Sequence, residues 1–233
     1  ILHTVQGAEV VQTTMNLNVT RGIVWGTQPV TNVGFTGTLD MGGGFSAVLG
    51  MMNNPTFVEV TDSNNSKGLT SRLNYGGDKF SIGAGVNWGK ADTRSGGVNA
   101  EVYNKILLFN VVASVDPTDN WTAYVDYTLN YTKGPDSTTH GIAIATRLAV
   151  LDTTGIAVRG EVLMDDDAQY SAGGNLWSVT GTIDHALTDN LTGNLEVRYD
   201  GVESGAGGFW NSSGTALSKD SQVLLLAQLV YQF

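Results

Sequence analysis

Apolar and polar residues alternate along most of this 233-residue chain, and this period of two restricts the fold more than any other feature. Along residues 191–200 the odd positions carry Leu, Gly, Leu, Val and Tyr, whereas the even positions carry Thr, Asn, Glu, Arg and Asp. Successive side chains of a β-strand point to opposite faces of its sheet. Because residues 121–131, 156–165 and 177–184 show the same pattern, the sequence predicts strands with one apolar and one polar face.

The connections between these segments are alternately short and long. Tight turns containing Gly, Asp, Asn or Pro, typical of hairpins, fall at 41–44, 76–78, 116–119, 152–155 and 188–190. Longer polar stretches fall between them, at 53–66, 92–103, 132–139, 166–174 and 201–221. The strands of a soluble sandwich would also alternate, but short turns at one end and long loops at the other are typical of an outer-membrane barrel.

Eleven strands are expected between these connections, each long enough to cross a bilayer at a tilt. They are 33–41, 45–52, 67–76, 79–91, 104–116, 121–132, 139–150, 155–165, 175–187, 191–200 and 221–233. A twelfth is expected within the first dozen residues. The predicted fold is all-β: a single domain over residues 1–233 that forms an antiparallel up-and-down transmembrane β-barrel, with about twelve strands in this chain.

The composition agrees with this fold class. Only 15% of the residues are charged, compared with roughly a quarter in ordinary soluble domains. The net charge of −10 argues against a nucleic-acid partner, because binding to phosphates requires a basic surface. The absence of cysteine excludes a disulfide framework, a thiol nucleophile and a thiolate metal site. No apolar run reaches the ~18 residues of a membrane helix.

Aromatic residues gather at both ends of the expected strands, nearly all on the apolar face. Amphipathic rings favour the headgroup level of a bilayer, so two such belts are expected of a lipid-facing barrel. The predicted girdle residues are Phe45, Tyr75, Phe80, Trp121, Tyr231 and Phe233 at the short-turn ends, and Trp88, Tyr131, Trp177 and Tyr199 at the long-loop ends.

The last expected strand is an alternating apolar row that ends in Tyr231 and Phe233. This row resembles the insertion signal of bacterial outer-membrane proteins, in which a terminal aromatic residue and another two residues before it are read by the barrel assembly machinery. Gln228 stands where that signal usually has a glycine. We expect Tyr231 and Phe233 to act in assembly; the simpler alternative is a strand that merely ends with the chain.

The polar face of the strands carries charges of both signs. The pore-lining residues expected from the alternation are Arg72, Asp126, Arg147, Arg159, Glu161, Asp184, Glu196 and Arg198. A charge on the lipid face would cost ~2–4 kcal/mol at the midplane, and the sequence predicts none there. Two interpretations remain: ion pairs that brace the wall, favoured by the neighbours Arg159 and Glu161, and a transverse field across a water-filled pore.

Small residues dominate the polar face of two expected strands. In 79–91 this face reads Ser, Gly, Gly, Asn, Gly, and in 139–150 it begins Gly, Ala, Ala. Glycine inside a strand often marks a bend or the close approach of another segment. The candidate for such an approach is residues 12–30, which carry several apolar side chains and one charge, Arg21. This segment is expected to line or narrow the pore, or to supply part of the wall.

The sequence offers little for catalysis. His3, His140 and His185 lack the serine spacing of a barrel lipase and the pair spacing of a metal site. The pair Gly83-x-Gly85 has neither the third glycine nor the helix of a dinucleotide fingerprint. We therefore expect no enzymatic activity, no cofactor and no metal.

The N-terminal part of the chain resembles the OmpL-like β-barrel porins. The matching features are Gly7-Ala8-Glu9-Val10, Asn16, Asn18-Val19-Thr20-Arg21, Pro29, Thr31-Asn32-Val33-Gly34 and Gly50-Met51-Met52-Asn53. Thr20 stands where the family has Ser, and Val19 where it usually has an aromatic residue. The resemblance implies a porin in the outer membrane of a Gram-negative-type bacterium. It also implies further strands before Ile1, because an N-terminal segment usually precedes this stretch in the family.

Two functions are compatible with these observations. The first is a porin that lets small hydrophilic solutes or ions diffuse through a polar lumen. The alternative is a structural or adhesive barrel with a packed lumen and extracellular loops that bind partners. The small residues of the polar face leave room for water and favour the porin. The expected partners are outer-membrane lipid and lipopolysaccharide, the barrel assembly machinery during insertion, and either further copies of the chain or a larger membrane complex.

Acidic residues in the long loops predict a weak preference for cations. A negative mouth concentrates cations, and salt screens this effect. The inward arginines oppose it. The mouth residues are Asp62, Asp92, Glu101, Asp136, Asp165, Asp166, Asp167 and Glu203.

Overall fold

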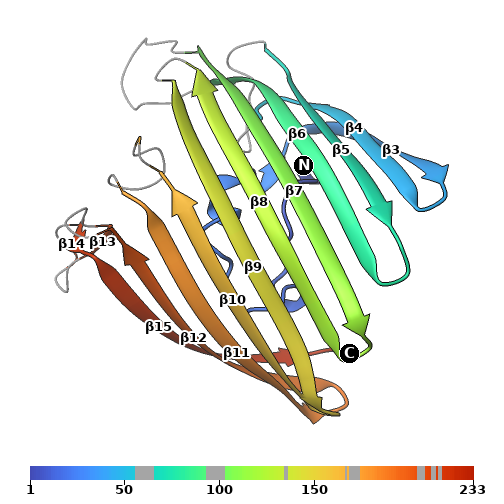
Figure 1. Cartoon of the computed structure of the whole chain (residues 1–233), viewed down its shortest axis with the longest axis vertical. Coiled ribbons are helices and arrows are strands. Elements are labelled where there is room, and N and C mark those ends of the chain that lie inside the picture. Colours follow the sequence, from blue (N-terminus) through green and yellow to red (C-terminus); the bar gives the residue numbers. More distant parts are fainter. Residues whose placement is uncertain are drawn as a thin grey trace.

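Eleven antiparallel strands form one long sheet, in the order β15-β12-β11-β10-β9-β8-β7-β6-β5-β4-β3 (Figure 1). The computed structural model describes residues 1–55, 66–92, 103–133, 136–165, 167, 174–203, 208–210, 214 and 217–233. The strands of the sheet are β3 (Gly34–Gly42), β4 (Phe45–Met52), β5 (Gly68–Gly76), β6 (Phe80–Asp92), β7 (Tyr103–Thr118), β8 (Trp121–Lys133), β9 (Ser137–Leu151), β10 (Thr154–Met164), β11 (Leu176–Thr188), β12 (Leu191–Val202) and β15 (Ser221–Tyr231).

All eleven strands expected from the alternation are confirmed, and each strand of the sheet pairs with the next strand of this sheet along the chain. The twelfth strand expected in the first dozen residues does not join this sheet. Only β1 (Leu2–His3) forms there, and it pairs with β2 (Thr31–Asn32) in a separate two-stranded sheet. A second small sheet joins β13 (Phe209–Trp210) to β14 (Leu217–Lys219).

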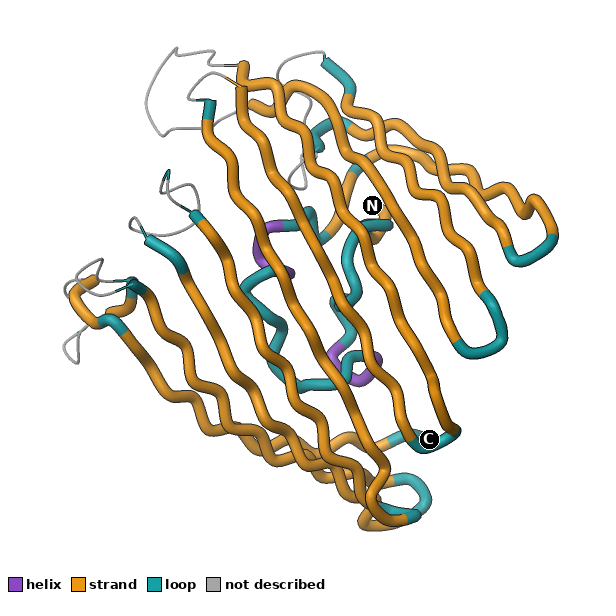
Figure 2. Tube along the Cα trace, in the orientation of Figure 1, coloured by secondary structure: helices purple, strands orange, loops and turns teal. Residues whose placement is uncertain are grey.

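The short turns lie along the right and lower edge of the sheet as drawn in Figure 1. In the turn between β3 and β4, Gly42, Gly43 and Gly44 all have positive φ, at 74°, 60° and 85°. Residues with a Cβ rarely adopt this conformation, so the Gly triplet fixes the hairpin at this point. The longer connections begin and end at the opposite end of the sheet (Figure 2).

The two faces of the sheet differ as the alternation predicts. We call the apolar face the outer face and the polar face the inner face. Leu39, Leu195 and Leu225 on the outer face are 62%, 64% and 75% exposed. On the inner face Asn87, Asn110 and Arg159 are completely buried. This molecule therefore has a polar interior and an apolar exterior, the reverse of a soluble domain. Among the described residues, no helix is long and apolar enough to cross a membrane.

Residues 4–30, which we call the inner segment, lie against the inner face instead of pairing with the sheet (Figure 2). The segment contains two short 3-10 helices, η1 (Thr13–Met15) and η2 (Trp25–Thr27). The sheet curls around it, with β3 and β15 as the two edges (Figure 1). Of the two expectations for residues 12–30, the structure shows a segment that lies against the inside of the wall and not one that supplies part of the large sheet. The segment also extends further toward the N-terminus than expected.

Candidate functional site

The inner segment first crosses the strands from β5 to β10. Gln6 Nε2 donates hydrogen bonds to the Ser71 carbonyl (3.1 Å) and to Asn87 Oδ1 (3.0 Å). The next two backbone N–H groups continue this path: Gly7 donates to Asn110 (2.9 Å) and Ala8 donates to Asp126 (2.8 Å). Because successive residues of the segment bond to successive strands, the segment runs across the wall and not along it.

The segment then returns along β12, β10 and β8. The carboxylate of Glu196 accepts hydrogen bonds from the backbone N–H groups of Val19 (2.6 Å) and Thr20 (2.9 Å). The carboxylate of Glu161 accepts from those of Ile23 and Val24, both at 3.2 Å. Hydrogen bonds from backbone N–H groups to a carboxylate are among the strong ones. Carboxylates of the wall therefore bind the returning part of the inner segment through its backbone N–H groups.

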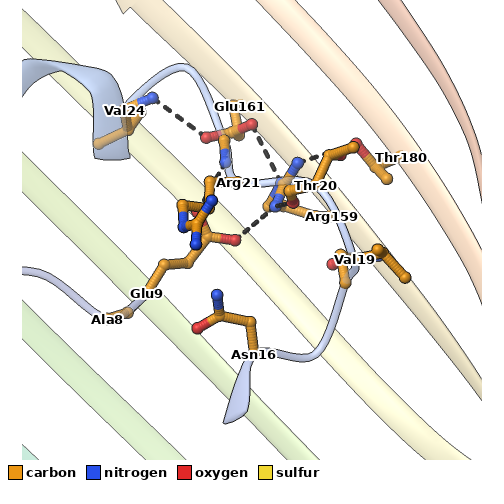
Figure 3. Close-up of polar contacts among 12 residues, drawn as sticks. Ala8, Glu9, Asn16, Val19, Thr20, Arg21, Val24, Arg159, Glu161 and Thr180 are labelled. Carbon is orange, nitrogen blue, oxygen red and sulfur yellow. Dashed lines mark hydrogen bonds and ion pairs between the residues drawn. The ribbon is translucent and has the colours of Figure 1, made fainter. Parts of the chain in front are cut away.

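Arg159 is the centre of this arrangement (Figure 3). Its Nη1 pairs with Glu9 of the inner segment and donates to the Thr20 carbonyl (2.7 Å). Its Nε lies 3.1 Å from Glu161 Oε2, and its Nη2 donates to Thr180 Oγ1 (3.1 Å). Arg159 thus links both passes of the segment to the wall.

Glycines make room where the segment touches the wall. A Cβ on Gly85 of β6 would lie 2.1 Å from Gln6 Oε1, and a Cβ on Gly141 of β9 would lie 3.0 Å from Val24 Cγ1. The small residues of β6 and β9 therefore accommodate the inner segment. The expectation that they simply leave space for water is wrong at these positions.

Each of the eight predicted pore-lining residues lies on the inner face, but their interaction partners differ. Six of them contact the inner segment: Arg72, Asp126, Arg159, Glu161, Glu196 and Arg198. Arg147 and Asp184 instead form an ion pair of 2.6 Å between β9 and β11. Arg198 also pairs with Asp200 on its own strand (2.6 Å). Ion pairs thus brace the wall, as the first interpretation holds, and the same charges bind the segment.

A polar cavity of about 190 Å³ remains between the inner segment and the lower part of β11, β12 and β15. Side-chain amides and hydroxyls provide most of its polar lining, and the Arg147–Asp184 pair borders it. Residues with such groups are Thr13, Thr14, Asn16, Asn18, Thr182, Thr192, Asn194, Gln228 and Gln232. Asn18 is 2% exposed and donates to Thr182 Oγ1 (2.7 Å). The cavity can hold water or a small hydrophilic molecule.

The ten predicted girdle residues lie on the outer face, in groups near both ends of the strands. Across β4, β5 and β6 the ring of Tyr75 lies 4.6 Å from that of Phe45 and 5.5 Å from that of Phe80. At the opposite end Trp177 and Tyr199 lie 5.2 Å apart. Tyr231 and Phe233 are strongly exposed, with rings 6.2 Å apart. Their role in assembly stays a prediction.

The outer face is not entirely without charge. Lys90, Lys105 and Lys133 are exposed on it at the long-loop ends of β6, β7 and β8. The prediction that no expected strand carries a charge on this face is therefore wrong for Lys90 and Lys105. The alternation itself contained the signal, because both residues share the parity of the apolar positions of their strands.

The predicted acidic mouth is only partly covered by the described residues. Asp136, Asp167 and Glu203 are exposed at the long-loop end, as expected. Asp165 is instead buried and accepts a hydrogen bond from Thr139 (2.9 Å), so it does not belong to an exposed mouth. Asp62, Glu101, Asp166 and the side chain of Asp92 lie outside the described residues.

The sheet resembles those of solved porins. An anion-selective porin from Comamonas acidovorans aligns over 85% of this chain and 58% of its own, with a TM-score of 0.63 and 10% identity. The outer membrane channel DcaP of Acinetobacter baumannii aligns over 83% and 61%, with a TM-score of 0.60 and 9% identity. A loop-deletion mutant of OmpT, an outer membrane protein of Vibrio cholerae, aligns over 84% and 62%, with a TM-score of 0.56 and 10% identity.

These likenesses establish the fold, and the chain spans about three fifths of each of these structures. No curated protein sequence matches the chain. The model of one protein family, "Putative beta-barrel porin-2, OmpL-like", matches residues 1–233, which is the whole of it. The chain therefore belongs to the OmpL-like β-barrel porin family, whose members reside in the outer membrane of Gram-negative-type bacteria.

Proposed function

We propose that this chain forms the wall and the constriction of a passive diffusion channel for small hydrophilic solutes or ions. One observation carries the proposal: the inner face is polar and charged along the strands, while the outer face is apolar between two aromatic groups. Such a sheet separates lipid from water. Of the eight predicted pore-lining charges, six would hold the inner segment in place, and this segment would narrow the pore.

The contacts of the inner segment also support a second candidate. Six charged wall residues hold this segment, and many inner side chains are fully buried beneath it. A structural barrel with a packed lumen would look similar over the same residues. The polar cavity of about 190 Å³ favours the channel, because a packed lumen would fill it.

The two sheet edges require partners in a membrane. Among the described residues, β3 and β15 each pair with one strand only, and unpaired backbone groups are costly in hydrocarbon. The porins that share the fold are longer than this chain. We propose that further strands of the porin pair with both edges, and that lipid, lipopolysaccharide, the barrel assembly machinery and further porin copies are its partners. We assign it a channel activity and no catalytic one.

Bilayer recording with the purified porin tests the proposal. We expect ion conductance and, in a KCl gradient, a reversal potential that indicates a modest cation preference. Because the acidic mouth acts at the surface, this preference should fall as the Debye length shortens from ~10 Å at 0.1 M to ~3 Å at 1 M. A clear anion preference would mean that the inward arginines set the field. Correctly folded porin without conductance would favour the packed barrel.

A further inference from the structure

The polar cavity between the inner segment and the wall has room for one small solute. Its volume is about 190 Å³, enough for about six water molecules at ~30 Å³ each. This is the space that a molecule of monosaccharide size occupies. Residues of β9, β11, β12, β15 and the inner segment line the cavity, so it forms only where the segment lies against the wall.

Side-chain amides provide many of the hydrogen-bonding groups of this cavity. Asn194 Nδ2 donates to Gln228 Oε1 (3.0 Å), and Gln228 Nε2 donates to Thr13 Oγ1 of the inner segment (3.3 Å). An amide has two donor hydrogens and an oxygen that accepts twice, so these groups keep capacity for a ligand. Thr192 adds a hydroxyl group on the same face of β12. Such a lining can both donate to and accept from the hydroxyl groups of a solute.

Asn18 of the inner segment adds a buried acceptor to this lining. Its Nδ2 donates to Thr182 Oγ1 (2.7 Å), and the Thr182 hydroxyl donates in turn to the Glu196 carboxylate (2.7 Å). Because an ionised carboxylate can only accept, this chain of hydrogen bonds fixes the orientation of the Asn18 amide. Asn18 Oδ1 then remains as an acceptor to which no described residue donates. An unpaired buried acceptor is costly, so a donor group within the cavity that Asn18 lines would be favoured.

The two charged residues that border the cavity compensate each other. Arg147 and Asp184 form two parallel hydrogen bonds, from Nε to Oδ1 (2.8 Å) and from Nη2 to Oδ2 (2.6 Å). In this bidentate geometry each charge already has its counter-charge. An ionic solute would have to enter the cavity without a counter-charge of its own, which is unfavourable. The lining therefore favours a neutral solute over an ionic one.

We propose that this cavity binds a neutral polyhydroxylated solute of monosaccharide size. The proposal rests on the proposed function, because it names a class of solute that the channel would pass. The hydroxyl groups of the solute would bond to the amides of Asn18, Asn194 and Gln228. Its C–H groups would contact Leu17 and Val230, which form part of the same lining. The site lies near the short turn between β11 and β12, at the short-turn end of the channel.

Two matched variants of the purified porin, Gln228→Leu and Gln222→Leu, test the site. Both remove the same amide from the inner face of β15, because the even positions of this strand share that face. Gln222 donates to Asp200 (2.7 Å) and is not among the residues that line the cavity. Thr192→Val is a second cavity variant, which exchanges a hydroxyl group for a methyl group. Circular dichroism in detergent confirms that each variant folds.

Saturation-transfer NMR in detergent measures the affinity for glucose, and for gluconate and glucosamine as an anionic and a cationic sugar of similar size. We expect the wild-type porin to bind glucose more tightly than either charged sugar. Gln228→Leu and Thr192→Val should bind glucose roughly three- to tenfold more weakly, the effect of one lost hydrogen bond between neutral groups. Gln222→Leu should bind glucose like the wild type.

A wild-type porin that does not bind glucose, or that binds gluconate or glucosamine more tightly, would overturn the proposal. Equal affinities of Gln228→Leu and Gln222→Leu for glucose would also overturn it. Conductance of the wild type in KCl is recorded separately, so that the site and the channel are tested independently. Glucose binding without conductance would support the site and contradict the channel, whereas conductance without glucose binding would contradict the site alone.

Discussion

Three carboxylates of the wall, those of Asp126, Glu161 and Glu196, accept hydrogen bonds from backbone N–H groups of the inner segment. The acceptors belong to strands that are far away in sequence; Val19 and Glu196 are 177 positions apart. All residues except proline have a backbone N–H group. These hydrogen bonds therefore depend on the path of the inner segment more than on its side chains. The backbone of the inner segment must therefore approach the wall closely, and a single substitution can prevent this approach.

Substitutions of Gly22 and Gly26 test whether the backbone of the inner segment must approach the wall closely. A Cβ on Gly22 would lie 1.8 Å from Glu161 Oε1, whereas a Cβ on Gly26 would meet nothing within 4 Å. Gly22→Ala should displace the carboxylate and lower the free energy of unfolding by about 1–3 kcal/mol, as overpacking does. Gly26→Ala should change it by less than about 1 kcal/mol. Urea unfolding in detergent measures the free energy of unfolding of both variants. Equal values for the two would contradict the close contact between Gly22 and Glu161.

Glu196→Gln tests the carboxylate clamp directly. The change removes the charge that accepts from Val19 and Thr20 and turns an NH₂ group toward N–H donors. A hydrogen bond to a charged group contributes ~1.5–3 kcal/mol, so hydrogen exchange of these two amides should accelerate roughly 10- to 100-fold. Asp184→Asn is the control, because the Asp184 carboxylate pairs with Arg147. If hydrogen exchange of these two amides accelerated similarly in both variants, the effect would not come from the hydrogen bonds to Glu196.

At the scale of single elements, alternation and turn residues were sufficient to predict the eleven strands of the sheet. Each strand is specified locally, since a shift of one residue would exchange its apolar and polar faces. The course of residues 4–11 could not be predicted in this way, because the N–H groups of Gly7 and Ala8 bond to side chains of distant strands instead of to a ladder. The glycines of β6 and β9 signalled a close approach, but not which residues of the segment they accommodate.

The register of β12 gives a prediction for one strand. Leu195 and Val197 lie on the outer face, and Glu196 between them lies buried on the inner face. The chain has no cysteine, so a fluorophore can be attached at one introduced cysteine at a time. Brominated lipids should quench labels at positions 195 and 197 but not at 196. Quenching at 196 alone would show that the strand presents its other face to lipid.

At the scale of the whole molecule, we propose that the inner segment lies inside the open channel. Met15 in η1 is 71% exposed, so its side chain points away from the wall. Thr153 lies in the short turn between β9 and β10, outside the enclosed space. The proposed constriction could not be located from composition or strand number, because its position depends on where this segment crosses the strands.

Single-channel recording of a Met15→Cys variant, treated with a water-soluble charged thiol reagent, tests this claim most directly. Since the wild type has no cysteine, the reagent can attach only at the introduced thiol. The conductance of Met15→Cys channels should fall in a step when the reagent is added, whereas Thr153→Cys channels should be unaffected. A Met15→Cys channel that reacts fully with the reagent and keeps its conductance would contradict the claim that residues 4–30 narrow the pore.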